Sequence, residues 1–349
     1  MEIKETLAAI LVESHKPLVL EKIQLPDQLR PGQLLVELIS SGICGAQINE
    51  IDAVKGPDLF LPHLLGHEGY ARVIETGPGV HKIKPGEHAI LHWRPSFGIQ
   101  SEPPKYFLNS RVVNAGWVTT FNRHAVVSEN RLTKVPVQKD IDFAPLLGCS
   151  LTTALGVLEN DARFSFRDSL LITGFGGVGQ AVLRFARFMN ARHITVVDKN
   201  PNKENEALRL GANNFTTSDG KMVALAQLQS LFAKVGSPTV TIETTGHPEM
   251  IELCYNLSND CGRTVLVGVP TRDRKAQLYT LPLHLGKSLV GSKGGGSNPD
   301  KDIPLILNLV STGELLSSDF PTITFDFMQI NEALNQLRTG LQGRPIIRF

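Results

Sequence analysis

The chain has 349 residues, of which 42% are hydrophobic and 20% are charged, proportions typical of a globular protein with both helices and strands. This length exceeds what one ordinary hydrophobic core organises, so we expect two domains. With 35 basic and 34 acidic side chains, the formal charge of +1 gives no electrostatic footprint for nucleic acid or an anionic membrane, and we predict neither as a partner.

The sequence also predicts a cytoplasmic protein. No stretch approaches the roughly 20 apolar residues that cross a bilayer. The amino terminus has acidic residues before its short apolar run, whereas a secretory signal has a basic start and a small-residue cleavage site. Four cysteines in so long a chain do not make a disulfide framework, so we expect free thiols, core residues or metal ligands. They are Cys44, Cys149, Cys254 and Cys261.

Along the chain, the predicted secondary structure changes character near its middle. Residues 1–148 contain short apolar or β-branched runs, such as 34–40, 71–77 and 87–93, separated by turns rich in Pro and Gly. Strands then alternate with helices from 169–200 onward, and the end of the chain returns to a mixed pattern. We therefore expect a parallel sheet covered by helices on both faces, inserted into a β-rich domain that both chain ends build.

A glycine-rich turn follows the apolar segment LLIT and precedes a helical pattern. Gly174, Gly176 and Gly179 form the motif GFGGVG there, and the next predicted strand ends at Asp198. A lone GxGxxG is weak, but this strand–turn–helix context followed by an acidic residue is the Rossmann dinucleotide-binding pattern. The alternative is a glycine turn in an unrelated sheet beside an acid placed there by chance.

This motif predicts a specific chemistry. The glycines allow the backbone to approach a pyrophosphate, whose charge the helix N-terminus stabilises. Asp198 is expected to accept hydrogen bonds from both adenosine-ribose hydroxyls and to repel the extra phosphate of NADP. NAD is therefore the predicted cofactor, although Lys199 leaves dual use of NAD and NADP open.

Three potential metal ligands each lie beside a glycine. Cys44 occurs in SGICGAQ, His67 in LLGHEG with Glu68 directly after it, and Cys149 in LLGCSLTTALG. Taken singly, each is explained as a core cysteine or a structural histidine. Together they supply two thiolates and an imidazole with a fourth position open, which is the arrangement of a catalytic zinc ion.

The motifs resemble, in order and spacing, the zinc-dependent alcohol dehydrogenase branch of the medium-chain dehydrogenase/reductase family. The resemblance covers essentially the whole chain. It is carried by GICG, GHEG, V-x-x-x-GPGV, KPGEH, GCSLTTALG, GFGGVG and VVD. It implies a β-rich GroES-like catalytic domain formed by residues 1–148 and 286–349, and a Rossmann domain, a doubly wound parallel sheet, formed by residues 149–285.

The resemblance also implies an activity. The chain would transfer a hydride between an alcohol and NAD, interconverting the alcohol with an aldehyde or ketone, and would form a homodimer or homotetramer. Cys44, His67 and Cys149 would hold one zinc ion per chain, and Glu68 would be able to enter the metal shell when substrate is absent. Zinc would bind the substrate oxygen as a Lewis acid and lower the pKa of the alcohol.

Cofactor-binding residues are implied in the same way. They are Thr153, Gly174, Gly176, Gly177, Val178, Gly179, Asp198, Lys203, Val267, Gly268, Val269 and Lys287. Thr153 and the strand end 267–269 would support the nicotinamide, and Val178 would pack against the cofactor. Lys203 would lie near the adenosine ribose and Lys287 near the pyrophosphate.

The chain departs from the family's pattern in several places. Many members have four cysteines for a structural zinc between the first and third ligands; this chain has none, so we predict a single zinc. Ala46 and Asn49 stand where a hydroxyl and a histidine commonly relay the alcohol proton. Gln47 stands where many members have an Asp that makes the ligand histidine more basic. Proton release is expected through ordered water or another side chain, such as His92.

His92, Trp93 and Arg94 are the candidate substrate contacts. A bulky indole between polar groups is compatible with a sugar-like, polyol or anionic substrate, and an ordinary amphipathic strand end is the alternative. Two other functions stay open. A zinc-independent quinone or enone reductase of the same fold would lack the ligand set, and only the missing relay favours a non-catalytic nucleotide-binding protein.

Overall fold

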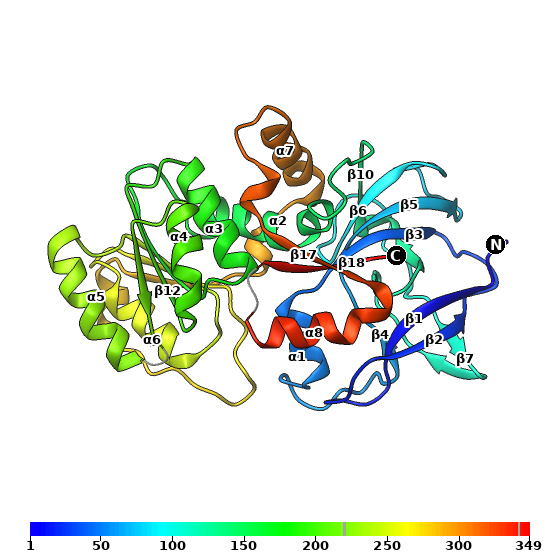
Figure 1. Cartoon of the computed structure of the whole chain (residues 1–349), viewed down its shortest axis with the longest axis horizontal. Helices are drawn as coiled ribbons and strands as arrows, with labels where there is room; N and C mark the ends of the chain where they lie inside the picture. Colours follow the sequence, from blue (N-terminus) through cyan, green and yellow to red (C-terminus); the bar gives the residue numbers. More distant parts are fainter. Residues whose placement is uncertain (219–220, 341–342) are drawn as a thin grey trace. The chain divides into compact units, whose positions relative to one another are not determined.

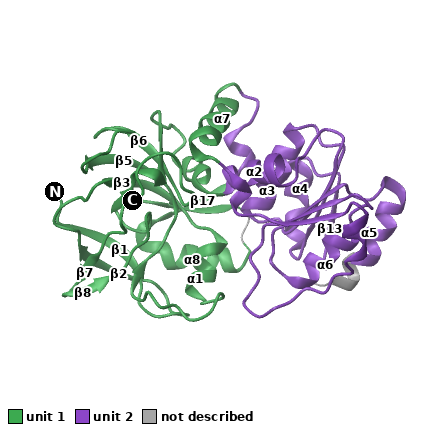
Figure 2. Ribbon diagram, turned by 180° about the vertical axis from the view of Figure 1, so that it is seen from behind, with its two compact units in different colours: residues 1–149, 298–312, 321–349 green, residues 150–297, 313–320 purple. Residues whose placement is uncertain are grey.

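The computed structural model describes residues 1–218, 221–340 and 343–349 (Figure 1). The chain divides into two compact units, each described by itself (Figure 2). Unit 1 comprises Met1–Cys149, Asn298–Thr312 and Pro321–Phe349, and unit 2 comprises Ser150–Ser297 and Gly313–Phe320. No helix within the described residues is long and apolar enough to cross a membrane.

Within its described residues, unit 1 contains a five-stranded and a seven-stranded sheet. The first has the order β4 (His63–Leu64), β1 (Glu5–Leu11), β2 (Val19–Gln24), β7 (Tyr106–Leu108) and β8 (Arg111–Val113). The second has the order β10 (Leu132–Val135), β6 (His88–His92), β5 (Glu68–Thr76), β3 (Gln33–Gly42), β18 (Arg344–Arg348) and β17 (Thr322–Asp326), with β9 (His124–Ser128) also paired to β3. Its helices are α1 (Gly45–Ile51), α7 (Pro299–Ser311) and α8 (Ile330–Arg338).

Strand β3 joins the cores of unit 1. Successive side chains of a strand point to opposite faces. Accordingly, Leu34, Val36 and Leu38 enter one buried cluster with Ala71 and other residues of neighbouring strands, whereas Leu35 enters another cluster. Because complete burial of a Leu or Val contributes roughly 1.5–3 kcal/mol, a shift of β3 by one residue would disturb both clusters at once.

Residues 93–127 stand where the resemblance would place a four-cysteine lobe, and hydrogen bonds organise the first part of this segment. Lys82 Nζ lies within hydrogen-bonding distance, 2.6–3.1 Å, of four acceptors that its three N–H groups share: Ser96 Oγ, the Phe97 and Leu132 carbonyls, and Asp300 at the start of α7. The buried Glu129 accepts from the backbone N–H groups of Lys82 and Ile99, at 3.0 and 2.8 Å. A partly buried ammonium and a buried carboxylate thus fix this loop to the sheet.

Within the part of the chain that the structure describes, unit 2 is built on a six-stranded parallel sheet. Its order is β13 (Asn214–Thr217), β12 (His193–Asp198), β11 (Ser169–Thr173), β14 (Val240–Glu243), β15 (Arg263–Leu266) and β16 (Ser288–Gly291). Its helices are α2 (Ser150–Gly156), α3 (Gly177–Phe188), α4 (Glu204–Arg209), α5 (Lys221–Val235) and α6 (Pro248–Leu257). The strand order reverses at β11, which creates the crevice where such sheets bind ligands.

The limits of unit 2 follow from two local features. Strand β16 pairs in parallel with β15, so the predicted domain boundary at residue 285 falls before the last strand of this sheet. The chain then returns to unit 2 at Gly313–Phe320, where Leu315 is fully buried and Asp319 accepts a hydrogen bond from Arg184 of α3 at 2.6 Å. Apolar burial and an ion pair together attach this returning segment.

Candidate functional site

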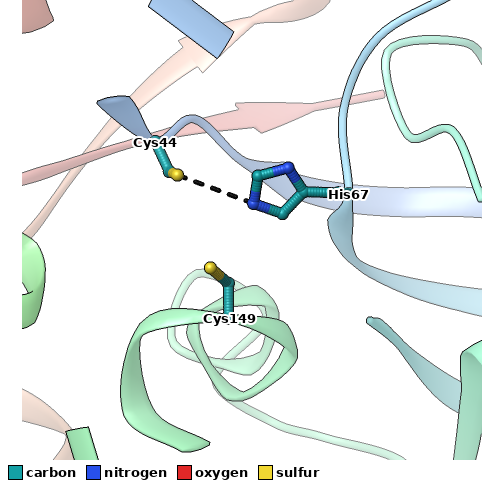
Figure 3. A group of neighbouring side chains, drawn as sticks. All are labelled: Cys44, His67 and Cys149. Carbon is teal, nitrogen blue, oxygen red and sulfur yellow. Dashed lines mark hydrogen bonds between the residues drawn. The ribbon is translucent and has the colours of Figure 1, made fainter. Parts of the chain in front are cut away.

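Cys44, His67 and Cys149 come together from three separate segments of unit 1. Cys44 is the N-cap of α1, His67 directly precedes β5, and Cys149 ends the short 3-10 helix η2 (Ala144–Gly148). One ligand atom of each lies within 4.8 Å of the others, and Figure 3 shows the three side chains pointing toward one another. No other group of three potential metal ligands occurs in the part of the chain that the structure describes.

The donor set fits a zinc ion. Two thiols and one ring nitrogen are soft and borderline donors of the kind that zinc prefers, and three protein ligands leave a fourth position for a substrate. A further donor lies next to them, because Glu68 is fully buried and its Oε2 has no hydrogen-bond partner. Cys44, His67 and Cys149 could therefore hold a metal ion, and Glu68 has a carboxylate oxygen with no hydrogen-bond partner.

Electrostatic coupling prepares the two cysteines for a cation. A hydrogen bond with Cys149 lowers the pKa of the Cys44 thiol well below its ordinary value, and the charges of His67 and Arg344 lower it further, although burial opposes them. For Cys149 the same hydrogen bond, together with burial, raises the pKa of the thiol. One of the two thiols therefore ionises readily while the other keeps its proton. Ionising both sulfurs would require a further positive charge beside them, such as a metal ion.

Arg344 of β18 neutralises Glu68 beside the cluster. Its Nη2 lies 2.5 Å from Glu68 Oε1, and both side chains are almost completely buried. Burial raises the pKa of Glu68 while the Arg344 charge lowers it, with a net increase. The sequence carries no local signal for Arg344, because 276 residues separate it from Glu68 and no motif surrounds it.

Gln47 is the neighbour of His67 on the side away from the cluster. His67 Nε2 lies 3.5 Å from Cys44 Sγ, and His67 Nδ1 lies 2.5 Å from Gln47 Nε2. Burial lowers the pKa of His67, but the Cys44 thiolate and nearby carboxylates raise it more, so the net shift is upward. Gln47 thus supplies an amide at the position where, as noted for the sequence, many members of the family have an Asp.

The glycine-rich turn of unit 2 lies between β11 and α3, with Gly177 and Val178 in the first helical turn. Gly174 has φ of 88°, in the region that favours glycine. A Cβ at Gly179 would lie 2.0 Å from the Gly174 carbonyl oxygen, so only glycine fits where the helix meets the turn. Gly176 has open space beside it, which leaves room for a ligand to approach the backbone.

Asp198 ends β12 and contacts this turn. Its Oδ2 accepts from the Phe175 N–H at 2.6 Å and from Lys203 Nζ at 3.1 Å, and its Oδ1 accepts from the Asn200 N–H at 2.9 Å. The carboxylate is buried at the end of the strand, and Lys203 is its charge partner. A carboxylate fixed in this way has lone pairs left for hydroxyl donors.

The other predicted cofactor residues of unit 2 are spread over several elements. Val267 and Gly268 follow β15, and their N–H groups both donate to the Glu243 carbonyl, whereas Val269 is half exposed. Thr153 is buried within α2. Lys287 Nζ donates to the Tyr255 and Ser258 carbonyls at 2.9 Å, so its ammonium caps the C-terminal end of α6.

The three candidate substrate residues have different surroundings. His92 is fully buried, with Nδ1 2.7 Å from the Arg94 carbonyl oxygen and Nε2 3.0 Å from Thr133 Oγ1, so both ring nitrogens face protein atoms. Trp93 and Arg94 are partly exposed, and the Arg94 guanidinium lies 5.5 Å from the Trp93 ring centroid. Trp93 and Arg94 thus present a cation over an aromatic face.

Comparisons with known proteins place the chain among dehydrogenases. A family model described as an alcohol dehydrogenase GroES-like domain matches residues 30–137, and one described as a zinc-binding dehydrogenase matches residues 177–312. The class-3 alcohol dehydrogenase of Cereibacter sphaeroides is 25% identical over 379 residues, covering 99% of this chain and 100% of the relative. The S-(hydroxymethyl)glutathione dehydrogenase of Photobacterium damsela subsp. piscicida is 25% identical, covering 98% and 99%.

Solved structures agree on the fold. The benzyl alcohol dehydrogenase from Acinetobacter calcoaceticus has a TM-score of 0.87 at 24% identity and covers 99% of this chain and 100% of its own. An alcohol dehydrogenase zinc-binding domain protein from Burkholderia ambifaria has a TM-score of 0.89 at 23% identity, with 99% of both chains covered. These likenesses, with the observed sheets, confirm the predicted combination of a GroES-like β-rich domain and a Rossmann sheet.

The burial of His92 makes the stability of the protein depend on pH. Burial lowers the pKa of His92 to about 4, whereas an exposed histidine has a pKa of about 6.5. Between these values the unfolded chain binds a proton at this position and the folded chain does not, so stability falls as the pH falls from about 6.5 toward 4. At pH 5 this amounts to about 2 kcal/mol.

We expect His92→Gln to lose this contribution to the pH dependence of stability. Between pH 7.5 and pH 5, the free energy of unfolding should therefore fall by about 2 kcal/mol less in His92→Gln than in the wild type. Urea unfolding at both pH values measures the difference. His284→Gln, at an exposed histidine, serves as the control. The same pH dependence in the wild type and in His92→Gln would contradict the assignment.

Proposed function

The chain belongs to the zinc-dependent alcohol dehydrogenase branch of the medium-chain dehydrogenase/reductase family, and on that premise we propose that Cys44, His67 and Cys149 hold its catalytic zinc ion. Its cofactors are zinc and NAD, and it is an oxidoreductase of alcohols and aldehydes. The observation that carries the proposed ligand set is the convergence of two thiols and an imidazole within 4.8 Å from segments far apart in the sequence.

The charges around the cluster support this assignment. Zinc held there would polarise the substrate oxygen as a Lewis acid and lower its pKa. With both thiols ionised, His67 neutral and the charge of Glu68 balanced by Arg344, these five side chains carry a net charge of −2, which matches a divalent cation. Arg344 keeps Glu68 Oε1 engaged, so only the unpartnered Oε2 is left to act as an additional ligand.

The turn after β11 is the proposed pyrophosphate site. The glycines bring backbone N–H groups and the N-terminus of α3 to one place, and Asp198 accepts the ribose hydroxyls while Lys203 holds its carboxylate in position. The proposed cofactor contacts are Thr153, Gly174, Gly176, Gly177, Val178, Gly179, Asp198, Lys203, Val267, Gly268 and Val269. Lys287 is not included, because its ammonium caps α6.

The proposed substrate is a small alcohol or carbonyl compound with polar groups, of the sugar-like or polyol kind. The partly exposed Trp93 and Arg94 support this class, since an indole and a guanidinium bind hydroxylated or anionic molecules. Proton release is assigned to water, because Ala46 and Asn49 supply no hydroxyl–imidazole relay and both nitrogens of His92 are already hydrogen-bonded. A cytoplasmic location is proposed from the four free thiols, which suit a reducing compartment.

Replacing a ligand sulfur tests the metal site. In Cys149→Ser we expect the zinc content to fall from about one ion per chain to below a tenth, because a hydroxyl is a poor zinc ligand at neutral pH. NAD reduction, screened over simple alcohols, polyols and sugar alcohols, should fall at least a hundredfold. Both quantities are measured on the same purified sample.

Cys261→Ser is the matched control, since this cysteine is exposed and lies outside the cluster. It should keep both zinc and activity. Absence of zinc in carefully prepared wild-type protein would overturn the metal mechanism and favour the zinc-independent reductase or the nucleotide-binding protein. Retention of zinc by Cys149→Ser would overturn the ligand set.

Asp198 is expected to determine the choice of cofactor. In Asp198→Asn, the ratio of kcat/KM for NAD to that for NADP should fall about 10–100-fold, because charge-assisted hydrogen bonds to ribose and repulsion of the phosphate are both lost. Steady-state kinetics with each cofactor measures the ratio, and Asp273→Asn, at an exposed aspartate of unit 2, is the control. An unchanged ratio would show that another group makes the selection.

We also propose that the chain forms a homodimer or homotetramer through the edge of its parallel sheet. Strand β16 is the last strand of that sheet. Its residue Val290 is 38% exposed, and the apolar residues Leu281 and Leu285, which precede the strand, are 50% and 70% exposed. Such an edge strand, which pairs with β15 alone among the described strands, suits pairing with a second copy.

Light scattering at micromolar concentration should therefore give two or four times the mass of the 38.2 kDa chain. Val290→Lys places a charge on this edge and should shift the protein to the monomer. Val137→Lys, at an apolar residue of unit 1 that is 71% exposed, should leave the mass unchanged. A monomeric wild type, or an unchanged mass in Val290→Lys, would contradict the proposed interface.

A further inference from the structure

Gln47 lies between two of the proposed ligands and contacts both. It is fully buried, on the first turn of α1. Its Oε1 accepts a hydrogen bond from the Cys44 N–H at 2.8 Å, and its Nε2 lies 2.5 Å from His67 Nδ1. A single amide therefore connects the backbone of the first ligand to the ring of the second.

The direction of this amide follows from the backbone. A backbone N–H can only donate, so the atom of Gln47 that faces Cys44 N must be the oxygen. The amide nitrogen, which can also only donate, then faces His67 Nδ1. Nδ1 acts as the acceptor of this hydrogen bond, and the proton of a neutral His67 ring is on Nε2.

That tautomer is the wrong one for a metal ligand. Nε2 is the ring nitrogen turned toward the cluster, 3.5 Å from Cys44 Sγ, and coordination uses its lone pair. Moving the proton from Nε2 to Nδ1 would place a ring N–H against the N–H groups of Gln47. If the amide turned to accept that proton, the partly buried Cys44 N–H would lose its acceptor.

We propose that Gln47 is a positioning residue that opposes metal binding at His67, so that this chain holds zinc less tightly than it would with a carboxylate at position 47. The inference rests on the proposed zinc site. A carboxylate of the same length can accept from the Cys44 N–H and from a protonated His67 Nδ1 at once, because it has acceptors on both oxygens. Partners of this kind typically change metal affinity 10–100-fold.

Gln47→Glu tests the proposal because it exchanges only the amide nitrogen for an oxygen. Metal-free proteins at pH 7.5 compete for Zn²⁺ with a chromophoric chelator of known affinity. We expect Gln47→Glu to bind zinc about 10–100-fold more tightly than the wild type. Gln47→Met, which has neither donor nor acceptor, should stay within about threefold of the wild type, because it removes the opposing N–H without supplying an acceptor.

Asn49→Asp is the matched control. It adds the same charge to the same helix by the same exchange of atoms, two residues further along. If Asn49→Asp and Gln47→Glu raise the zinc affinity equally, the proposal is overturned. The added negative charge would then attract zinc without any specific contact to His67. A wild type that binds zinc as tightly as Gln47→Glu would also overturn it. A wild type that binds no zinc would instead overturn the proposed function.

A second measurement does not depend on zinc or on catalysis. Histidine ¹⁵N NMR of the metal-free wild type should show Nδ1 of His67 as an unprotonated nitrogen, and Gln47→Glu should show it protonated. A protonated Nδ1 in the wild type would overturn the proposal. If Gln47→Glu does not fold without metal, two measurements still test whether Gln47 opposes zinc binding. They are the wild-type spectrum and the zinc affinity of Gln47→Asp, which carries a shorter carboxylate.

Discussion

The close convergence of two thiols and an imidazole is the geometric requirement around which the strands and loops of unit 1 are arranged. Uncharged, such groups are tolerable in a protein interior, but ionised sulfurs require a compensating cation. The fold brings the three ligands together from α1, from the residue before β5 and from the end of η2. The sheets therefore serve to position side chains whose charges would otherwise repel, and the Glu68–Arg344 pair keeps the neighbouring carboxylate from adding to that repulsion.

Much of this arrangement can be predicted from the sequence, because its signals are local. The apolar segment LLIT and the glycine turn after it predict the strand and helix that the structure shows as β11 and α3. The spacing to the next apolar run is enough to place Asp198 at the end of the following strand. The three ligands could be grouped because each lies beside glycine in a short motif. Short apolar or β-branched runs between Pro and Gly turns likewise indicated strands in the first part of the chain, without indicating which strands pair.

Other features depend on contacts between distant segments, which no motif records. Arg344 becomes part of the site only because β18 pairs with β3, and nothing around residue 344 indicates a partner 276 residues away. Lys287 was expected near a pyrophosphate from its position in the chain, yet its ammonium satisfies carbonyls at the end of α6. His92 sits in a strand pattern that does not distinguish a ring facing a pocket from one enclosed by Thr133 and the Arg94 backbone.

The ammonium of Lys82 has a consequence for the architecture of the protein. It joins the loop after β6, the strand β10 and the start of α7, in the region where many family members use a second metal ion. An ammonium cannot be extracted by a chelator, and it has no sulfur ligands to be oxidised. Removal of the zinc ion should consequently abolish catalysis while the surrounding fold remains intact. Activity and folding are therefore separable properties in this chain.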